Sequence, residues 1–133
     1  MVSKLRSERI GDRIREEFSE MLIDEISDPR LNGIFITDVK VDRELSYADI
    51  YISSIDGFKK WQEIKVGLEH AQGFIRHELA TRIELRIFPR LRFHWDPTPE
   101  KAASMEILFA SLHKEEKQGK KNTKPGEEIE GNG

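Results

Sequence analysis

The chain has 133 residues, of which 37% are hydrophobic and 35% charged, with no cysteine and a formal net charge of −3. This length supports one domain with a hydrophobic core and a tail, and the absence of cysteine excludes disulfides and thiolate chemistry. No apolar run approaches the roughly 20 residues of a membrane helix, and the polar start does not resemble a secretory signal, so we expect a cytoplasmic protein with no membrane partner.

Charge is segregated along the chain. Residues 23–56 contain eight acidic and three basic residues, a net charge of −5, whereas residues 57–95 contain eight basic and four acidic residues, a net charge of +4. Because local potential rather than net charge attracts a polyanion, the basic half remains compatible with nucleic-acid binding.

The first expected element is an amphipathic helix over residues 4–26. Ser3 or Ser7 is suited to cap its start, and its apolar positions recur at helical spacing: Ile10, Ile14, Phe18, Met21, Leu22 and Ile26. Arg6 and Arg9 lie on a neighbouring stripe. They are either RNA contacts or solvated charges that pair within the helix.

A β-hairpin is expected next, with strands at residues 34–41 and 47–53. Both segments are rich in β-branched and aromatic residues. The apolar phase of the first strand slips near Thr37 and Asp38, which predicts a bulge or burial on both faces. Asp56 is then placed to cap the following helix.

The second helical region spans residues 57–82 and contains Gly73. A glycine inside a helix costs roughly 1 kcal/mol relative to alanine, so Gly73 predicts a bend or a close backbone approach. Lys59 and Lys60 lie in the first turn of this region. They are either phosphate contacts or two solvated lysines.

The third expected strand, residues 85–95, has two different faces. Leu85, Ile87, Leu91, Phe93 and Trp95 alternate with Arg86, Arg90, Arg92 and His94, and Phe88 falls on the arginine side. Together with Arg76 this arginine face would offer a continuous patch to phosphates, with Phe88, Tyr47 or Tyr51 available for stacking. Alternatively, the arginines pair with Asp38 or Asp49 on the neighbouring strand. Pro89 indicates an edge strand or a bulge.

Residues 96–99 break this strand, and residues 100–113 are typical of a short helix. We therefore expect an RNA-binding domain at 1–96, a helical extension at 97–113 and a disordered charged tail at 114–133. The expected fold class is α+β, with a three-stranded sheet covered by helices on one face.

Signatures of catalysis and metal binding are absent from the sequence. It contains no Gly-rich phosphate loop, no Gly-x-Ser-x-Gly and no His-Glu-x-x-His, and none of the four histidines has a histidine partner at i+4. We therefore expect no catalytic residue, no cofactor and no metal.

The order helix–strand–strand–helix–kink–helix–strand resembles a type II KH domain, an RNA-binding fold. A usual KH domain has a Gly-x-x-Gly loop between its two helices, and here that place is taken by Ala71-Gln72-Gly73. This junction is similar to that of the bacterial ribosome-binding factor A family. Further segments carry the same resemblance: Phe74 to Arg76, Leu85-Arg86, Pro89 to Phe93, Asp28-Pro29-Arg30, and the first-helix arginines Arg6 and Arg9.

The resemblance implies a non-enzymatic, monomeric assembly factor that binds the small (30S) ribosomal subunit and its 16S rRNA late in maturation, alongside other assembly factors. It also implies support for 16S precursor processing and for growth in the cold. By position, Ala71 and Gly73 would set the kink, and Arg76, Arg86, Arg90 and Arg92 would be RNA-contact candidates. Charge and place in the helices add Lys59, Lys60, Arg6 and Arg9 to these candidates. The alternative is a protein–protein docking module that binds a ribosomal protein or an assembly GTPase.

Overall fold

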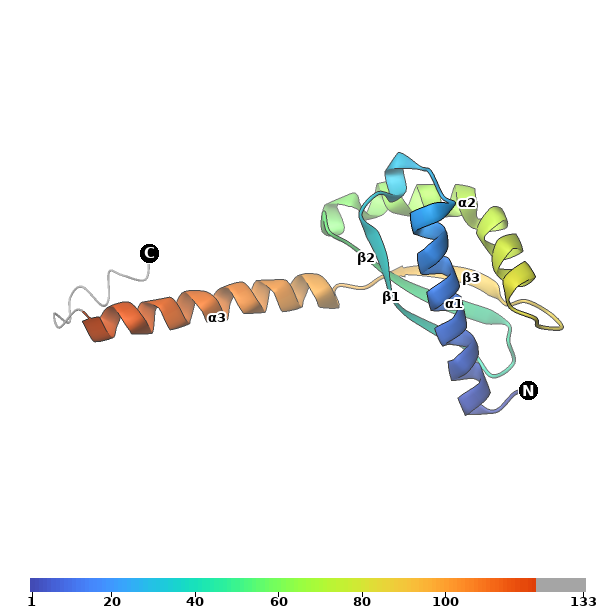
Figure 1. The fold of residues 1–133 in the computed structure, drawn as a ribbon, viewed down its shortest axis with the longest axis horizontal. Coiled ribbons are helices and arrows are strands. Elements are labelled where there is room, and N and C mark those ends of the chain that lie inside the picture. Colours follow the sequence, from blue (N-terminus) through green and yellow to red (C-terminus); the bar gives the residue numbers. More distant parts are fainter. Residues whose placement is uncertain (122–133) are drawn as a thin grey trace. The chain divides into compact units, whose positions relative to one another are not determined.

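The computed structural model describes the backbone of residues 1–121 and the side chains of residues 1–114. The chain divides into a compact domain, residues 1–97, and a second unit that begins at Thr98. The domain contains, in order, α1 (Lys4–Asp24), the 3-10 turn η1 (Pro29–Leu31), β1 (Ile34–Val41), β2 (Tyr47–Ser54), the 3-10 turn η2 (Phe58–Lys60), α2 (Trp61–Arg82) and β3 (Arg90–Trp95) (Figure 1).

The three strands form one sheet in the order β1-β2-β3. The hairpin strands β1 and β2 are antiparallel, whereas β2 and β3 are parallel and are connected by α2. A parallel pair needs such a crossover because a tight turn cannot return the chain in the same direction. The register of the hairpin shifts between Ile36 and Asp38, which confirms the predicted bulge. The α+β prediction with helices on one face of the sheet is also confirmed.

The core lies between this face of the sheet and the two helices. Ser3 caps α1, since its Oγ accepts a hydrogen bond from the backbone N of Arg6 at 3.0 Å. The predicted apolar stripe of α1 is buried from Ile10 to Met21, and Phe18 is fully buried. Leu22 and Ile26 are only partly buried, and Ile26 lies beyond the helix, which ends at Asp24. Gly11 lets α1 lie very close to β1, because a Cβ atom there would be 2.6 Å from the carbonyl oxygen of Val39.

Helix α2 is continuous from Trp61 to Arg82, and Figure 1 shows that it changes direction along its length. Gly73 lies on its exposed side, and a Cβ atom there would meet no described atom within 4 Å. The sequence predicted either a bend or a close backbone approach at Gly73, and a close approach within the domain therefore does not apply.

Two local predictions were wrong. Strand β3 begins at Arg90 rather than at residue 85, because Pro89 has no amide hydrogen to donate to the sheet and residues 85–89 form an irregular segment. Consequently Arg86 precedes the strand, and Phe88 is largely buried in the core, although it still lies near Arg86 and Arg90. Asp56 does not cap a helix either, since η2 starts after Gly57 without a side-chain cap.

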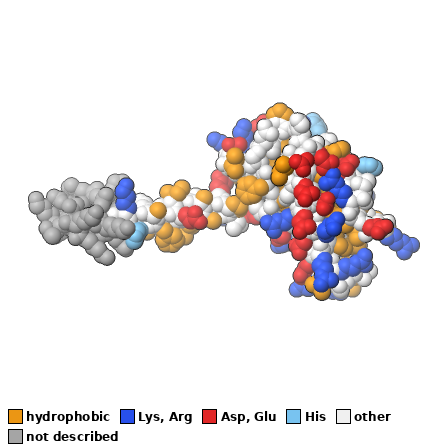
Figure 2. All heavy atoms as spheres, in the orientation of Figure 1, with side chains coloured by type: hydrophobic (Ala, Val, Ile, Leu, Met, Phe, Trp, Pro, Cys, Tyr) orange, Lys and Arg blue, Asp and Glu red, His pale blue; other side chains and the backbone are white. Residues whose placement is uncertain are grey.

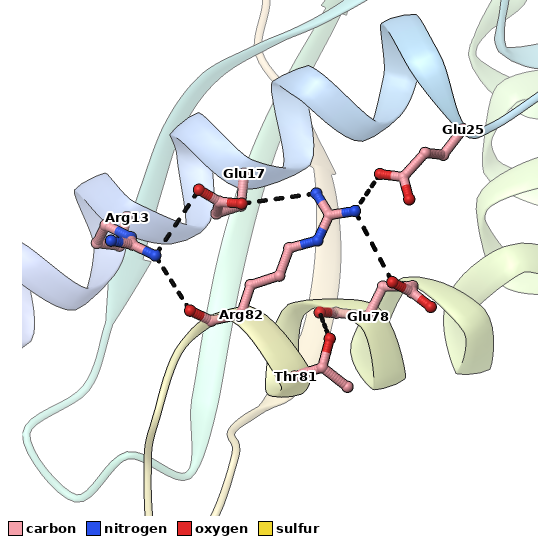
Figure 3. Close-up of polar contacts among 6 residues, drawn as sticks. All are labelled: Arg13, Glu17, Glu25, Glu78, Thr81 and Arg82. Carbon is pink, nitrogen blue, oxygen red and sulfur yellow. Dashed lines mark hydrogen bonds and ion pairs between the residues drawn. The ribbon is translucent and has the colours of Figure 1, made fainter.

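An ion-pair cluster around Arg82 joins α1 to the end of α2 (Figure 3). The Arg82 guanidinium pairs with Glu25, with Glu17 at 3.5 Å and with Glu78 at 3.8 Å. The hydrogen bond that Arg82 donates to the Glu25 carboxylate is the main reason that the pKa of Arg82 lies above its ordinary value. Arg13 adds a second cation, donating to the carbonyl oxygen of Arg82 at 3.1 Å.

The second unit begins with α3 (Thr98–Lys121). This helix is longer than the predicted helix at 100–113 and takes in the start of the predicted tail, and residues 122–133 of that tail lie outside the described residues. Apolar side chains on α3 are exposed, among them Met105, Leu108, Phe109 and Leu112. None of the helices in the described part of the chain is both long and apolar enough to cross a bilayer.

Candidate nucleic-acid interface

Four of the predicted arginines line one cavity of about 900 Å³, which we call the arginine cavity. It forms where the start of α1, the β1–β2 turn and the segment between α2 and β3 come together. Glu44 is the one acidic residue in its lining, which consists of Met1, Val2, Arg6, Glu44, Leu45, Ser46, Tyr47, Arg76, Leu85, Arg86, Ile87, Phe88 and Arg90. Figure 2 shows Lys and Arg side chains gathered at the end of the domain that carries the N-terminus.

Three of these arginines carry free guanidinium groups. The side chains of Arg6, Arg86 and Arg90 are exposed, and none forms a hydrogen bond or ion pair within the described residues 1–114. Free guanidinium groups bind phosphate oxygens through two parallel hydrogen bonds and stay charged at any physiological pH. The cavity is therefore electropositive although the whole chain is acidic.

Arg76 has a structural contact in the same place. Its Nε donates to the carbonyl oxygen of Pro89 at 3.1 Å and its Nη2 to that of Phe88 at 2.6 Å. These bonds tie the irregular segment before β3 to α2. Arg76 thus positions the segment that carries Arg86 and Arg90, and a direct RNA contact from Arg76 stays a prediction.

Arg92 lies outside the arginine cavity and pairs across the sheet. Its Nε and Nη2 donate to the two carboxylate oxygens of Asp49 at 2.8 and 3.1 Å, and its guanidinium lies 3.8 Å from the centre of the Tyr47 ring. His94 contacts the same carboxylate at 2.7 Å and stacks on Tyr51. The structure therefore contains the cross-strand pairing for Arg92, so this arginine is not a free phosphate ligand.

These contacts decide the protonation of Asp49. Burial raises the pKa of Asp49, but the hydrogen bonds from Arg92 and His94 together outweigh burial and leave the pKa below its ordinary value. The carboxylate therefore remains charged at neutral pH and holds both neighbouring side chains.

The other predicted contacts are not part of the arginine cavity. Arg9 is exposed on α1 but does not line it. Lys59 and Lys60 lie in η2, before α2, and Lys60 pairs with Glu63 at 3.5 Å. Lys60 lines a separate cavity of about 250 Å³, together with Asp56 and Glu63. The acidic neighbours weaken any attraction of this second cavity for phosphate.

Sequence reasoning placed Tyr47 and Phe88 near the arginines, and both line the arginine cavity, but it missed two other apolar residues of the lining, Leu45 and Ile87. Leu45 adopts a φ of 56°, a left-handed conformation that glycine and asparagine favour, and no sequence signal marked this leucine. The turn around it is held by Asp42, whose carbonyl accepts from Leu45 N at 2.9 Å and whose Oδ1 accepts from Tyr47 N at 2.7 Å. Ile87 is another wall residue and is 71% exposed.

Among the described residues, no group of three or more His, Asp or Glu side chains is arranged to hold a metal ion. The charged side chains that line the arginine cavity are Arg6, Arg76, Arg86, Arg90 and Glu44.

A crossover helix over a β1-β2-β3 sheet, together with the basic cavity, defines a KH-like domain with a surface suited to a polyanion. The crystal structure of ribosome-binding factor A from Thermus thermophilus has this fold, with a TM-score of 0.60 and 20% identity over 67% of this chain and 93% of that one. The family model "Ribosome-binding factor A" matches residues 6–109. The chain belongs to the ribosome-binding factor A family.

Named relatives agree with this membership. Ribosome-binding factor A of Staphylococcus carnosus is 36% identical over 115 residues, covering 86% of this chain and 100% of the relative. The protein of the same name from Chromohalobacter salexigens is 44% identical over 107 residues, covering 78% of this chain and 81% of the relative. The family was therefore correctly identified from the sequence.

Proposed function

We propose that this protein is a non-enzymatic assembly factor that binds the 30S subunit through 16S rRNA late in maturation and supports 16S precursor processing. Family membership supports the ribosomal partner, since the relatives are named for ribosome binding. Action as a cytoplasmic monomer that supports growth in the cold is part of the same proposal.

The observation that carries RNA binding is the set of free arginines in the arginine cavity. Arg6, Arg86 and Arg90 come from α1 and from the segment around the start of β3, yet all three line one concave surface. A cluster of unpaired cations on one surface is the electrostatic footprint of a phosphate-binding protein. We propose these three as the principal RNA contacts, with Arg76 holding the segment in place.

The middle of α2 is proposed as a second approach point. Ala71 and Gly73 have small side chains, and the surface over Gly73 is open. Glycine weakens a helix, and Gly73 packs against no described atom of the domain. Its surface therefore leaves room for the backbone of a bound RNA to come close. In this proposal Ala71 and Gly73 set the bend and admit the RNA backbone.

Co-sedimentation with purified 30S and 50S subunits tests the proposal. Wild type is expected to bind 30S only. Three phosphate contacts predict a loss of affinity of roughly 20-fold between about 50 and 200 mM salt. The double variant Arg86→Ala/Arg90→Ala is expected to bind more weakly and to lower the salt slope by about 0.7 for each arginine removed.

Matched controls keep the result interpretable. Arg15→Ala removes an exposed arginine of α1 that does not line the arginine cavity, and it is expected to leave binding nearly unchanged. The fold of each variant is checked by circular dichroism. Equal binding by wild type and a folded double variant contradicts the assignment of these arginines, and failure of wild type to bind 30S contradicts the proposed function.

Exposed apolar side chains favour one second candidate, a docking module for a ribosomal protein or assembly GTPase. Ile23 and Ile55 are 82% and 79% exposed, and α3 carries a further apolar group around Phe109. Binding through these side chains would be insensitive to salt and would survive loss of the arginines. The same co-sedimentation series therefore separates the two candidates.

A further inference from the structure

The arginine cavity has a shape and lining that phosphate binding alone does not require. We propose that it holds one unstacked base of single-stranded RNA, while Arg6, Arg86 and Arg90 bind the phosphates on either side. This inference rests on the proposed function and names the form of RNA that the site takes.

The first argument is volume. The cavity measures about 900 Å³, within the range of about 300–1,000 Å³ that is typical of pockets for small organic ligands. A phosphate-binding surface can be flat, because charge alone attracts the backbone. A concave site of this size can also enclose a planar group attached to that backbone.

The second argument is the alternation of charge and apolar surface. Leu45, Ile87 and Tyr47 lie among the arginines in the lining. Ile87 is 71% exposed and therefore contributes little to the core. Apolar and aromatic side chains between phosphate ligands suit the face of an unstacked base, which single-strand-binding proteins hold by stacking.

The third argument is the backbone of the wall. Leu45 keeps a left-handed conformation that a leucine rarely adopts, and two hydrogen bonds to Asp42 hold the turn there. Backbone strain of this kind is found preferentially at binding sites. At position 45 this conformation places the large apolar side chain of leucine in the lining of the cavity. Glycine or asparagine, which favour the conformation, would have a smaller side chain there.

The fourth argument concerns what cannot enter. An A-form duplex keeps its bases stacked inside and presents its backbone as a broad convex surface. Such a duplex can touch the rim arginines but cannot place a base in the cavity. The site is therefore expected to prefer single strands to duplexes of equal charge.

Fluorescence anisotropy with the full chain tests this directly. The probes are labelled octauridylate, an abasic ribose-phosphate octamer of the same charge, and a fully paired RNA hairpin. Octauridylate is expected to bind about tenfold more tightly than the abasic octamer, because stacking of one base gives a gain of that size. Equal affinities of the two octamers, or tighter binding of the hairpin, would overturn the proposal.

A pair of isoleucine variants locates the base. Ile87→Ser removes an apolar wall without changing charge, and it is expected to bring octauridylate close to the abasic octamer with an unchanged salt slope. The control Ile23→Ser alters an equally exposed isoleucine outside the arginine cavity and is expected to change neither affinity. A selectivity for octauridylate that persists in Ile87→Ser would place the base elsewhere and refute this site.

Failure of this inference is distinguishable from failure of the proposed function. If wild type binds 30S but does not distinguish the two octamers, the function stands and the base site is wrong. If wild type prefers octauridylate and loses this preference in Ile87→Ser, yet does not bind 30S, the base site stands and the ribosomal partner is wrong.

Discussion

Two glycines inside helices should respond to the same substitution in opposite directions. Alanine is preferred over glycine in a helix interior by about 0.8–1 kcal/mol, so propensity alone favours replacement at both places. At Gly11, however, the added Cβ would lie 2.6 Å from the Val39 carbonyl oxygen. Rotation of a side chain cannot relieve this contact, because the backbone fixes the positions of both atoms. At Gly73 the added Cβ meets nothing within 4 Å.

The magnitudes follow from this difference. Forcing extra volume into a packed contact costs about 1–3 kcal/mol, and the propensity gain of about 1 kcal/mol offsets part of this cost, so Gly11→Ala should lower the free energy of unfolding by about 1 kcal/mol. Gly73→Ala should raise it by about 1 kcal/mol. Urea denaturation followed by circular dichroism measures both values.

An intermediate position provides the control. A Cβ at Gly67 would be 3.1 Å from Leu31 Cδ2, a side-chain atom that can shift, and 3.2 Å from Arg30 Cβ, which can shift only with its backbone. Gly67→Ala should therefore fall between the other two variants. A Gly11→Ala protein as stable as wild type would refute the reasoning for α1, and a Gly73→Ala protein less stable than wild type would refute it for α2.

The remaining predictions concern charge and domain structure. Because the folded pKa of Asp49 lies below its ordinary value, its carboxylate stabilises the fold above about pH 4, and this contribution is lost as pH falls through the lower folded pKa. Asp49→Asn should therefore be less stable than wild type at pH 7 by urea denaturation, and the difference should shrink as the pH is lowered below about 4. A difference in stability that stays the same as the pH falls would contradict the ion pair. Arg82→Met removes the cation that Glu17, Glu25 and Glu78 share, so it should lower the melting temperature in low salt. The loss should be smaller in high salt, because salt screens the repulsion between the three glutamates. Arg15→Met, which removes no ion pair of the described residues, is the control. A chain that ends after Pro97 should melt within about 2 °C of the full chain, because every residue of the buried core lies before that point; a much lower calorimetric midpoint would show that α3 stabilises the domain.

The order of elements was predictable because each has a clear periodicity or breaker. The stripe from Ile10 to Met21 marked α1, and the phase slip at Thr37 marked the bulge. The start of β3 was not predictable in the same way, since the alternation of Leu85, Arg86 and Ile87 imitates a strand although Pro89 prevents pairing there.

The site was predicted only in part. Periodicity placed Arg90 and Arg92 on one strand face, and the structure keeps them there. It could not tell that Asp49 pairs with Arg92 while Arg90 stays free, because that choice depends on cross-strand register. Nor could spacing show that Arg6 and Arg86 line the same cavity, because residues so far apart in sequence come together only in the folded domain.

The arginine cavity draws its lining from Val2 at one end of the domain and from Arg90 at the start of its last strand. A chain that has formed α1 and the hairpin but has not yet docked β3 has no such cavity. Ligand binding is therefore coupled to completion of the fold: RNA at a hundred times its dissociation constant would stabilise the whole domain by about 2.7 kcal/mol. If RNA binds there as proposed, a partly folded molecule would not receive this stabilisation, and RNA binding would favour the completely folded protein.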